Sequence, residues 1–267
     1  MKKDFQYYFD NWRYILPRFG KMNKISPIST GKIKFEDIFE IKRGLATGAN
    51  SFFVMERSEA KIKCIPDIAI KPLLPKARYL KSLIINSKYD GYPDVEPQLV
   101  LIDSDLDEEL IRNKYPPFYD YLQLAKLKLG VDKPIIERTL VKSRKPWYSQ
   151  EKRSAAPFLL TYMGRNKKNL PPLYFLLNKS DALALNTYIL LYPKCWCKNL
   201  LKTDNSLYEK ILAALNKSAE HIISQQTRIY SGGLQKLEPG ALKSLPVIGL
   251  PEEIITAFNI NLSILDC

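Results

Sequence analysis

The chain has 267 residues, and 46% of them are apolar, which is enough to bury one large or two small cores. Its 41 Lys and Arg residues outnumber its 28 Asp and Glu residues, so the net charge is +13 and a polyanionic partner such as nucleic acid is favoured. No apolar run reaches the roughly 18 residues of a membrane span, and the N-terminus lacks a signal-peptide core, so we expect a cytoplasmic protein without a membrane partner.

The cysteines predict neither a disulfide framework nor a metal centre. Cys195 and Cys197 form a lone Cys-x-Cys pair, and the single histidine, His221, lies far from it along the chain. A structural zinc site needs about four ligands at characteristic spacings. We therefore expect reduced thiols and no bound metal.

Residues 1–32 form an aromatic-rich segment that we assign to docking or linking. Its aromatic side chains are Phe5, Tyr7, Tyr8, Phe9, Trp12, Tyr14 and Phe19. Clustered aromatic residues require a surface to pack against. Two surfaces fit equally: the core of this domain, or a neighbouring domain outside this chain.

Residues 35–41 and 52–55 are strand-like and flank a glycine-punctuated polar loop, an arrangement that predicts a hairpin-like unit. Gly44 and Gly48 permit positive φ and close backbone approach. The polar side chains around them suit phosphate oxygens or base edges, namely Lys42, Arg43, Thr47, Asn50 and Ser51. The same glycines also suit an ordinary tight connection between strands.

Residues 99–102 predict a strand, and an acidic stretch follows at residues 103–109. We interpret these carboxylates as the start of a helix rather than as metal ligands, because carboxylates stabilise helix N-termini. A second helix is predicted to begin at Pro116, with an aromatic face toward the core.

Positive charge is concentrated between Lys133 and Lys168, where ten Lys and Arg residues accompany two Glu residues. Residues 142–153 interleave cations with aromatic and amide side chains, which is typical of a nucleic-acid surface. The predicted DNA contacts in this region are Lys142, Arg144, Lys145, Trp147, Tyr148, Ser149, Gln150, Arg153, Arg165 and Lys168. The alternative is a solvated basic face, and we expect Trp147 to be partly buried in either case.

Residues 157–163, 173–177 and 182–192 predict three successive strands, and a helix is predicted to start at Ser206. A second glycine-punctuated loop, at residues 230–239, contributes Gln235 as a further DNA contact. The chain thus divides into the docking segment, a recognition domain at residues 33–250 and a C-terminal tail at residues 251–267.

Four motifs occur in the order found in one protein family. They are RGLATGANSFF at 43–53, KPWY at 145–148, NTY at 186–188 with LYP at 191–193, and SGGLQKLEP at 231–239. Together they resemble the C-terminal target-recognition region of TaqI- and Eco57I-like adenine-N6 DNA methyltransferases of restriction-modification systems. The resemblance covers nearly the whole chain, and it implies an α+β fold of mixed, largely antiparallel β-sheets with flanking helices, related in kind to type I specificity subunits.

The resemblance implies a division of labour. This chain would recognise a short sequence in double-stranded DNA, while a catalytic methyltransferase domain or subunit binds S-adenosylmethionine and receives the flipped adenine. The catalytic motifs of that family, a glycine-rich cofactor loop and Asn-Pro-Pro-Tyr, do not occur here, and we interpret NLPPLY at 169–174 as a proline turn between strands. We therefore expect no catalytic residue and no bound cofactor on this chain.

Three other interpretations stay open. The first is a nuclease, which requires clustered carboxylates and a lysine. The second is a stand-alone specificity subunit that recruits a separate methyltransferase or nuclease. The third is an RNA-binding module that stacks bases on Trp147, Tyr148 and Tyr162.

Overall fold

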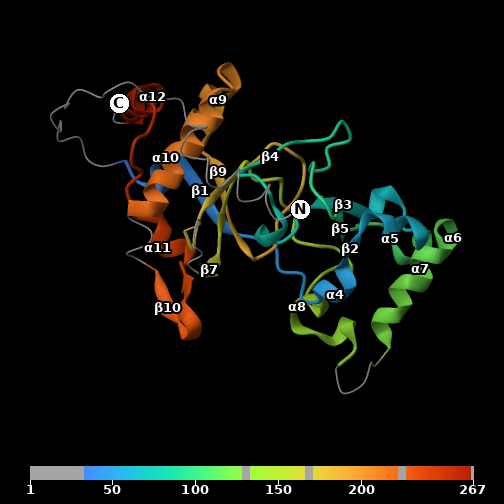
Figure 1. Ribbon diagram of the computed structural model, residues 1–267. Helices are drawn as coiled ribbons and strands as arrows, with labels where there is room; N and C mark the ends of the chain where they lie inside the picture. Colours follow the sequence, from blue (N-terminus) through green and yellow to red (C-terminus); the bar gives the residue numbers. More distant parts are fainter. Residues whose placement is uncertain (1–32, 128–132, 166–170, 222–226, 266–267) are drawn as a thin grey trace.

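The computed structural model describes residues 33–127, 133–165, 171–221 and 227–265. The aromatic-rich segment 1–32 and Lys168 lie outside these residues. Within them the protein has the predicted α+β architecture, with a central five-stranded sheet, two three-stranded sheets and flanking helices (Figure 1).

The central sheet has the strand order β1 (Phe39–Arg43), β9 (Tyr188–Pro193), β6 (Phe158–Thr161), β8 (Phe175–Asn178) and β4 (Ile84–Ile85). Neighbouring strands are antiparallel except for β4 and β8, which are parallel. Every residue of β6 and β8 is buried. Both faces of the sheet are therefore covered, which explains why these strands are unbroken apolar runs in the sequence.

Helices cover one face of the central sheet. They are α3 (Phe35–Ile38), α9 (Cys195–Thr203), α10 (Leu207–His221) and α11 (Pro239–Lys243), and they share one apolar cluster with the sheet. The opposite face carries a second cluster, which includes Leu159 and Leu176 and is bordered by η2 (Ala77–Tyr79).

The segment predicted to be a C-terminal tail contains a helix, α12 (Glu252–Leu265). Its Ile254 is fully buried in the core of the central sheet. The rings of Phe258 on α12 and Trp196 on α9 lie 5.8 Å apart between centroids. The structure thus places α12 in the folded domain, because its apolar side chains pack against α9.

A second lobe is built on the sheet β2 (Val54–Glu56), β5 (Leu99–Ile102) and β3 (Ile70–Leu73), and its core includes Phe53 and Phe118. Its helices are α4 (Asn50–Phe53), α5 (Arg57–Ile62), α6 (Glu108–Lys114), α7 (Pro116–Gln123) and α8 (Thr139–Lys142), with the 3-10 turns η1 (Asp67–Ala69), η3 (Leu124–Lys126) and η4 (Ile135–Glu137). In Figure 1 the second lobe and the helices α9 to α12 lie on opposite sides of the central sheet.

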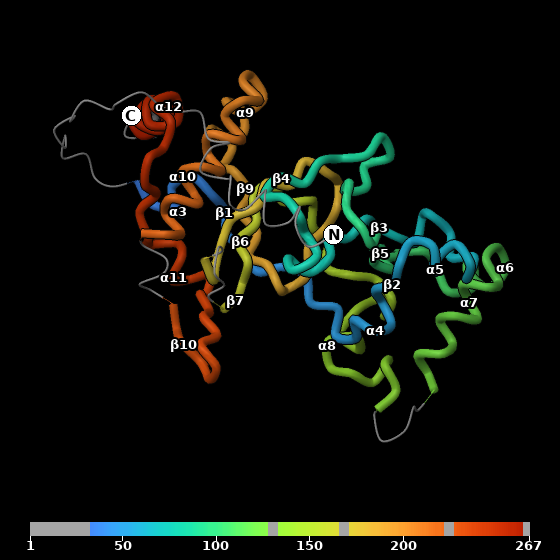
Figure 2. Tube along the Cα trace, in the orientation of Figure 1, coloured from blue at the N-terminus to red at the C-terminus, as the bar shows by residue number. Residues whose placement is uncertain are grey.

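The third sheet consists of β7 (Met163–Arg165), β11 (Leu234–Lys236) and β10 (Arg228–Tyr230), with η6 (Ser231–Gly233) as the turn between β10 and β11. Its strands are antiparallel. The tube in Figure 2 shows β10 and its turn projecting from the rest of the molecule on the side opposite α9.

The predicted hairpin of residues 35–41 and 52–55 is wrong. β1 pairs with β9 of the central sheet, whereas β2 pairs with β5 of the second lobe. The reason is that the chain leaves the central sheet at Gly44, whose N–H donates to the carbonyl oxygen of Tyr188 at 3.0 Å. Leu45 then enters the core of the second lobe. The glycine loop therefore connects two lobes.

The strands and helices predicted elsewhere are confirmed, with small differences in their bounds. β5 forms at residues 99–102, β6 lies within residues 157–163, and β8 and β9 each end one residue beyond the segments predicted for them. The acidic stretch leads into α6, where the Asp107 carboxylate accepts a hydrogen bond from the N–H of Glu109 at 2.8 Å. α7 begins at Pro116 and buries Phe118.

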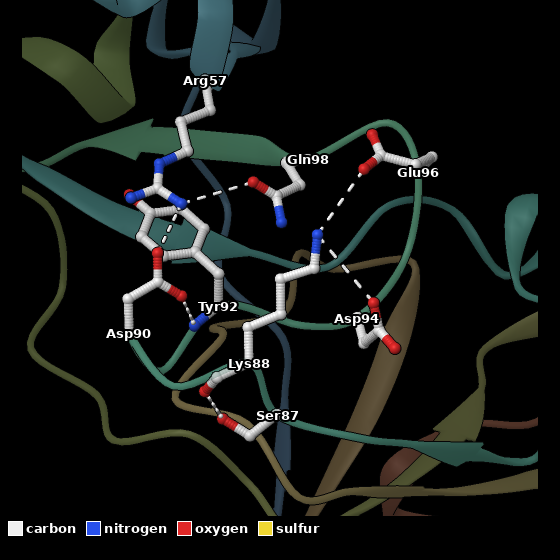
Figure 3. Close-up of polar contacts among 8 residues, drawn as sticks. All are labelled: Arg57, Ser87, Lys88, Asp90, Tyr92, Asp94, Glu96 and Gln98. Carbon is white, nitrogen blue, oxygen red and sulfur yellow. Dashed lines mark hydrogen bonds and ion pairs between the residues drawn. The ribbon is translucent and has the colours of Figure 1, made fainter.

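Arg57 holds the segment between β4 and β5 against the second lobe (Figure 3). Its Nη1 donates to Asp90 Oδ2 at 2.7 Å and to Gln98 Oε1 at 3.3 Å. The guanidinium carbon lies 3.6 Å from the centroid of the Tyr92 ring. The hydrogen bond from Arg57 lowers the pKa of Asp90 below its usual range.

This lowered pKa predicts a loss of stability in acid. A carboxylate whose folded-state pKa is depressed stabilises the fold above its unfolded-state pKa, and this contribution is lost as the pH falls through the folded-state pKa. We expect Asp90→Asn to be less stable than the wild type at neutral pH, and the difference to shrink below about pH 4, the ordinary pKa of aspartate. Urea denaturation at several pH values measures both quantities.

Asp120→Asn, on the exposed side of α7, is the matched control and should follow the wild type at every pH. A difference between Asp90→Asn and the wild type that stays constant with pH would contradict the role of the Asp90 charge.

Candidate nucleic-acid interface

The candidate interface centres on the loop of residues 44–49, between β1 and α4. A Cβ atom on Gly44 would overlap the backbone carbonyl group of Leu185. Gly48 has a φ of +78°, in the left-handed region that favours glycine. The backbone path itself therefore requires a glycine at both positions.

The side chain of Thr47 lies inside the loop, and Thr47 is only 1% exposed. Its hydroxyl donates to Oδ1 of Asn50 at 2.5 Å and accepts from the N–H of Ala49 at 3.1 Å. Thr47 therefore shapes the entry into α4, and it has no open path to a base edge. Because the amide oxygen of the exposed Asn50 is engaged, Asn50 offers its NH₂ group as a donor.

Two arginines bind the carbonyl groups of the loop. Arg144 Nη2 donates to the carbonyl oxygen of Ala46 at 2.8 Å, and Arg138 Nη1 donates to that of Gly48 at 3.3 Å. Burial lowers the pKa of the Arg144 guanidinium, which still stays charged at neutral pH. Two oxygens that would repel a phosphate are thus paired with cations.

Arg153 makes the same kind of contact at the start of the loop, where its Nη1 donates to the carbonyl oxygen of Arg43. Its Nη2 pairs with both carboxylate oxygens of Glu151, at 2.7 and 2.9 Å. Arg144 and Arg153, predicted as phosphate contacts, therefore have their guanidinium groups directed at the loop backbone.

Tyr148, Ser149 and Gln150 are buried beneath this loop. Their side chains donate to the backbone carbonyl oxygens of Leu106, Pro146 and Ile102, respectively. Because these three side chains are buried, they cannot contact DNA from this position, and they support the loop from below. Trp147 is half-buried, as predicted, with its ring centroid 6.0 Å from that of Phe52.

Six of the predicted contacts are exposed on the loop and on the elements beside it. We call this set the basic loop surface: Lys42, Arg43, Asn50, Ser51, Lys142 and Lys145. It combines four cations with amide and hydroxyl groups. As neighbours in β1, Lys42 and Arg43 point to opposite faces of the central sheet, toward Tyr192 and Tyr162 respectively. Lys42 also pairs with Glu40 at 2.8 Å, an exposed ion pair that a phosphate can replace at small cost.

Arg165 and Gln235 lie on the third sheet. The exposed Arg165 donates from Nε to the carbonyl oxygen of Gly232 at 3.0 Å. Gln235 is half-buried, and its Oε1 accepts from the Thr227 hydroxyl at 2.9 Å.

The third sheet adjoins the basic loop surface at Tyr162. The guanidinium carbon of Arg43 lies 4.8 Å from the centroid of the Tyr162 ring, and the Lys236 ammonium lies 5.0 Å from it. Lys236 and Arg138 are not among the DNA contacts predicted from the sequence, because the ring of Tyr162 and the carbonyl oxygen of Gly48, beside which they lie, are distant in the chain.

The described residues were compared with the requirements of a metal centre and of a membrane span. They contain no group of three or more His, Cys, Asp and Glu residues that could hold a metal ion. Among the described residues, Cys64, Cys195 and Cys197 are not joined in disulfides. Across the same residues, no helix is long and apolar enough to cross a bilayer. The glycine loop itself is flanked by exposed cations, which suit an anionic polymer.

Comparison with known proteins shows the family. The model described as the C-terminal domain of the type II methyltransferase M.Eco57I matches residues 13–263. The chain belongs to this family. The resemblance predicted from the four motifs is confirmed, and the chain corresponds to a C-terminal domain of type II restriction-modification methyltransferases.

Two relatives show the same similarity. The chain is 29% identical to the type II methyltransferase M.XamI of Xanthomonas campestris pv. amaranthicola over 226 residues. This alignment covers 84% of this chain and 38% of the relative. It is 25% identical to the type II methyltransferase M.AccI of Acinetobacter calcoaceticus over 212 residues. This alignment covers 79% of this chain and 35% of the relative. The chain thus spans little more than a third of the length of these proteins.

Two solved structures are also similar. The type IIG restriction endonuclease BpuSI aligns with 87% of this chain and 26% of its own, at a TM-score of 0.44 and 16% identity. The type IIL restriction-modification enzyme MmeI, solved in complex with DNA, aligns with 85% of this chain and 32% of its own, at a TM-score of 0.36 and 10% identity.

The close contact at Gly44 predicts that the substitution Gly44→Ala strongly lowers the stability of the fold. The added methyl group would overlap the backbone at Leu185, so the two lobes would have to separate locally. We expect the free energy of unfolding to fall by about 2 kcal/mol or more, measured by urea denaturation.

Gly240→Ala, in α11, is the control, since nothing lies within 4 Å of its added Cβ. It should leave the stability unchanged or raise it slightly, because alanine favours helices. Similar losses for both variants would show that the Gly44 contact is not the constraint.

The buried position of Thr47 predicts that Thr47→Val lowers the stability of the fold. This substitution keeps the shape of the side chain but removes its hydroxyl group. The N–H of Ala49 and the amide oxygen of Asn50 would each lose a partner. We expect a loss of about 1–2 kcal/mol in the free energy of unfolding. Thr203→Val, at the exposed end of α9, removes one hydroxyl bond to Leu200 and should cost less than about 0.5 kcal/mol.

Proposed function

We propose that this chain is the DNA target-recognition domain of an adenine-specific type II methyltransferase. It binds double-stranded DNA sequence-specifically in the cytoplasm, and a separate catalytic domain or subunit carries out the methylation. The observation that carries the proposal is the basic loop surface: backbone carbonyl oxygens of the loop are bonded to arginines, while Lys42, Arg43, Lys142 and Lys145 are exposed beside it.

The cations of this surface contact phosphates and set the register on the duplex. Asn50 and Ser51, which are exposed at the start of α4, contact base edges. Because Asn50 offers NH₂ donors, it selects an acceptor in the major groove, such as N7 of a purine or O4 of thymine. The arginines beneath the loop act as positioning residues, since they hold the backbone that carries Asn50.

The catalytic step belongs to another domain. S-adenosylmethionine supplies the methyl group and is bound there. The central sheet of this chain is largely antiparallel, so it lacks the parallel switch point at which doubly wound folds bind nucleotide cofactors. Residues 171–174, from the NLPPLY stretch, lead directly into β8 of that sheet. M.XamI and M.AccI extend well beyond the region that matches this chain, which leaves room for such a domain in them.

Two rival interpretations lose support. An RNA-binding platform would need exposed rings, whereas Tyr148 and Tyr162 are buried and Trp147 is half-buried. A metal-dependent nuclease would need a carboxylate cluster, and the described residues contain none that could hold a metal ion. A stand-alone specificity subunit uses the same DNA surface and differs only in how the catalytic partner is attached.

A salt-titrated selection from a random duplex library tests the proposal. Sequencing of the retained DNA at each salt concentration should show a short motif that persists at high salt. Lys142→Ala and Lys145→Ala should each make the slope of log affinity against log salt shallower by about 0.9, on all sequences. Asn50→Ala should cost about 1–3 kcal/mol on the enriched motif only.

Lys202→Ala is the matched control, because this exposed cation lies on α9, on the opposite side of the molecule from α8 in Figure 1. It should leave the slope unchanged. The absence of any duplex binding by the wild type would refute the proposed function, and binding without an enriched motif would refute the base-reading part.

A further inference from the structure

The third sheet has two chemically different faces. Residues opposite each other in antiparallel strands share a face, and so do residues two apart in one strand. Arg228 pairs with Lys236, which pairs with Met163, and Tyr230 pairs with Leu234, which pairs with Arg165. These six residues therefore lie on one face, which we call the cationic face.

The other face carries the third row, Ile229, Gln235 and Gly164. At Gly164 this face is covered, because a Cβ atom there would overlap the carbonyl oxygen of Pro172. The side chain of Gln235 is engaged by Thr227 on this side. The face therefore has apolar and neutral groups only.

The two faces of the third sheet differ in charge. The three strands contain Arg165, Arg228 and Lys236 and no acidic residue. Lys236 is paired with Glu238 at 2.6 Å, so Arg165 and Arg228 carry the net positive charge of the cationic face. Both are exposed. Arg165 is held by its bond to the carbonyl oxygen of Gly232. The guanidinium groups of Arg165 and Arg228 suit phosphate oxygens, which arginine binds in a bidentate manner.

Apolar groups accompany these arginines. Tyr230 is 45% exposed and Met163 is 46% exposed, on the same face. A tyrosine ring and a thioether beside two guanidinium groups suit the sugars and base edges that lie between phosphates. Their exposure leaves both side chains free to contact a ligand that is bound by the two arginines.

The cationic face continues the basic loop surface. Lys236 and Arg43 both lie against the ring of Tyr162, at 5.0 and 4.8 Å from its centroid. The hydroxyl of Tyr162 donates to Glu238 at 2.9 Å, which fixes the ring between the two surfaces. Glu238 is the acidic group at this junction, and its charge is paired with Lys236, so a polyanion bound at Arg43 can reach Arg165 and Arg228.

We propose that the cationic face of the third sheet is a second DNA-binding surface, which lies against the same duplex as the basic loop surface. Arg165 and Arg228 contact phosphates, and Tyr230 and Met163 pack on the sugars and base edges between them. The inference rests on the proposed function, and it adds the third sheet and the face by which that sheet binds. It also places Gln235 on the face turned away from DNA.

The test is the salt dependence of duplex binding by the full chain, measured for variants on both faces of the third sheet. Arg228→Gln, on the cationic face, should make the slope of log affinity against log salt shallower by about 0.9, and Arg165→Gln with Arg228→Gln by about twice that. Tyr230→Ala should weaken binding about tenfold or less without changing the slope.

Ile229→Ala is the matched control. Ile229 lies between Arg228 and Tyr230 in sequence, points to the opposite face and is 72% exposed. It should bind with the affinity and slope of the wild type. Thermal unfolding of all variants excludes misfolding as the cause of weaker binding, and Arg228→Gln gives the decisive result if Arg165→Gln disturbs the turn at Gly232.

The outcomes separate the two proposals. If the wild type does not bind duplex DNA, the proposed function fails. If the wild type binds and Lys145→Ala changes its slope, but Arg228→Gln and Tyr230→Ala do not differ from it, only the second surface is refuted. A loss for Ile229→Ala without a loss for Arg228→Gln would assign binding to the other face and would also overturn the inference.

Discussion

The close contact between Gly44 and Leu185 is the constraint on which the rest of the structure depends. At this point the chain leaves the central sheet, and the N–H groups of Gly44 and Leu45 donate to the carbonyl oxygens of Tyr188 and Ala184. A side chain at residue 44 would overlap the facing backbone. The contact therefore joins the central sheet to the second lobe, and the loop of residues 44–49 begins from a fixed position.

The cations of this protein have two physical roles. Arg138, Arg144 and Arg153 face inward and bind backbone carbonyl oxygens, which a planar guanidinium with several donors does better than an ammonium group. Lysines such as Lys142 and Lys145 face the solvent, where a flexible charge can follow a phosphate backbone. The inward arginines thus provide the rigidity on which precise base contacts rely, and the outward lysines provide long-range attraction.

Several features could be predicted because their signals are local. The buried strands β6, β8 and β9 appear as apolar runs, and α6 and α7 begin at acidic and proline residues that favour helix starts. The hairpin at residues 35–55 could not be predicted correctly, since both possible partners of β1 are apolar strands. The choice of β9, some 150 residues away, is made by packing in the core.

The sequence by itself determined the family, the α+β class, the excess of positive charge and the glycine loop with its cationic flanks. Only the tertiary structure decided which of those cations reach the solvent and which hold the loop. The reason is that these contacts join residues 90 to 110 positions apart, so they depend on how the two lobes meet. Tertiary structure also decided which residues lie on each face of the third sheet, because the strand register between β7 and β11 is set by residues far apart in the chain.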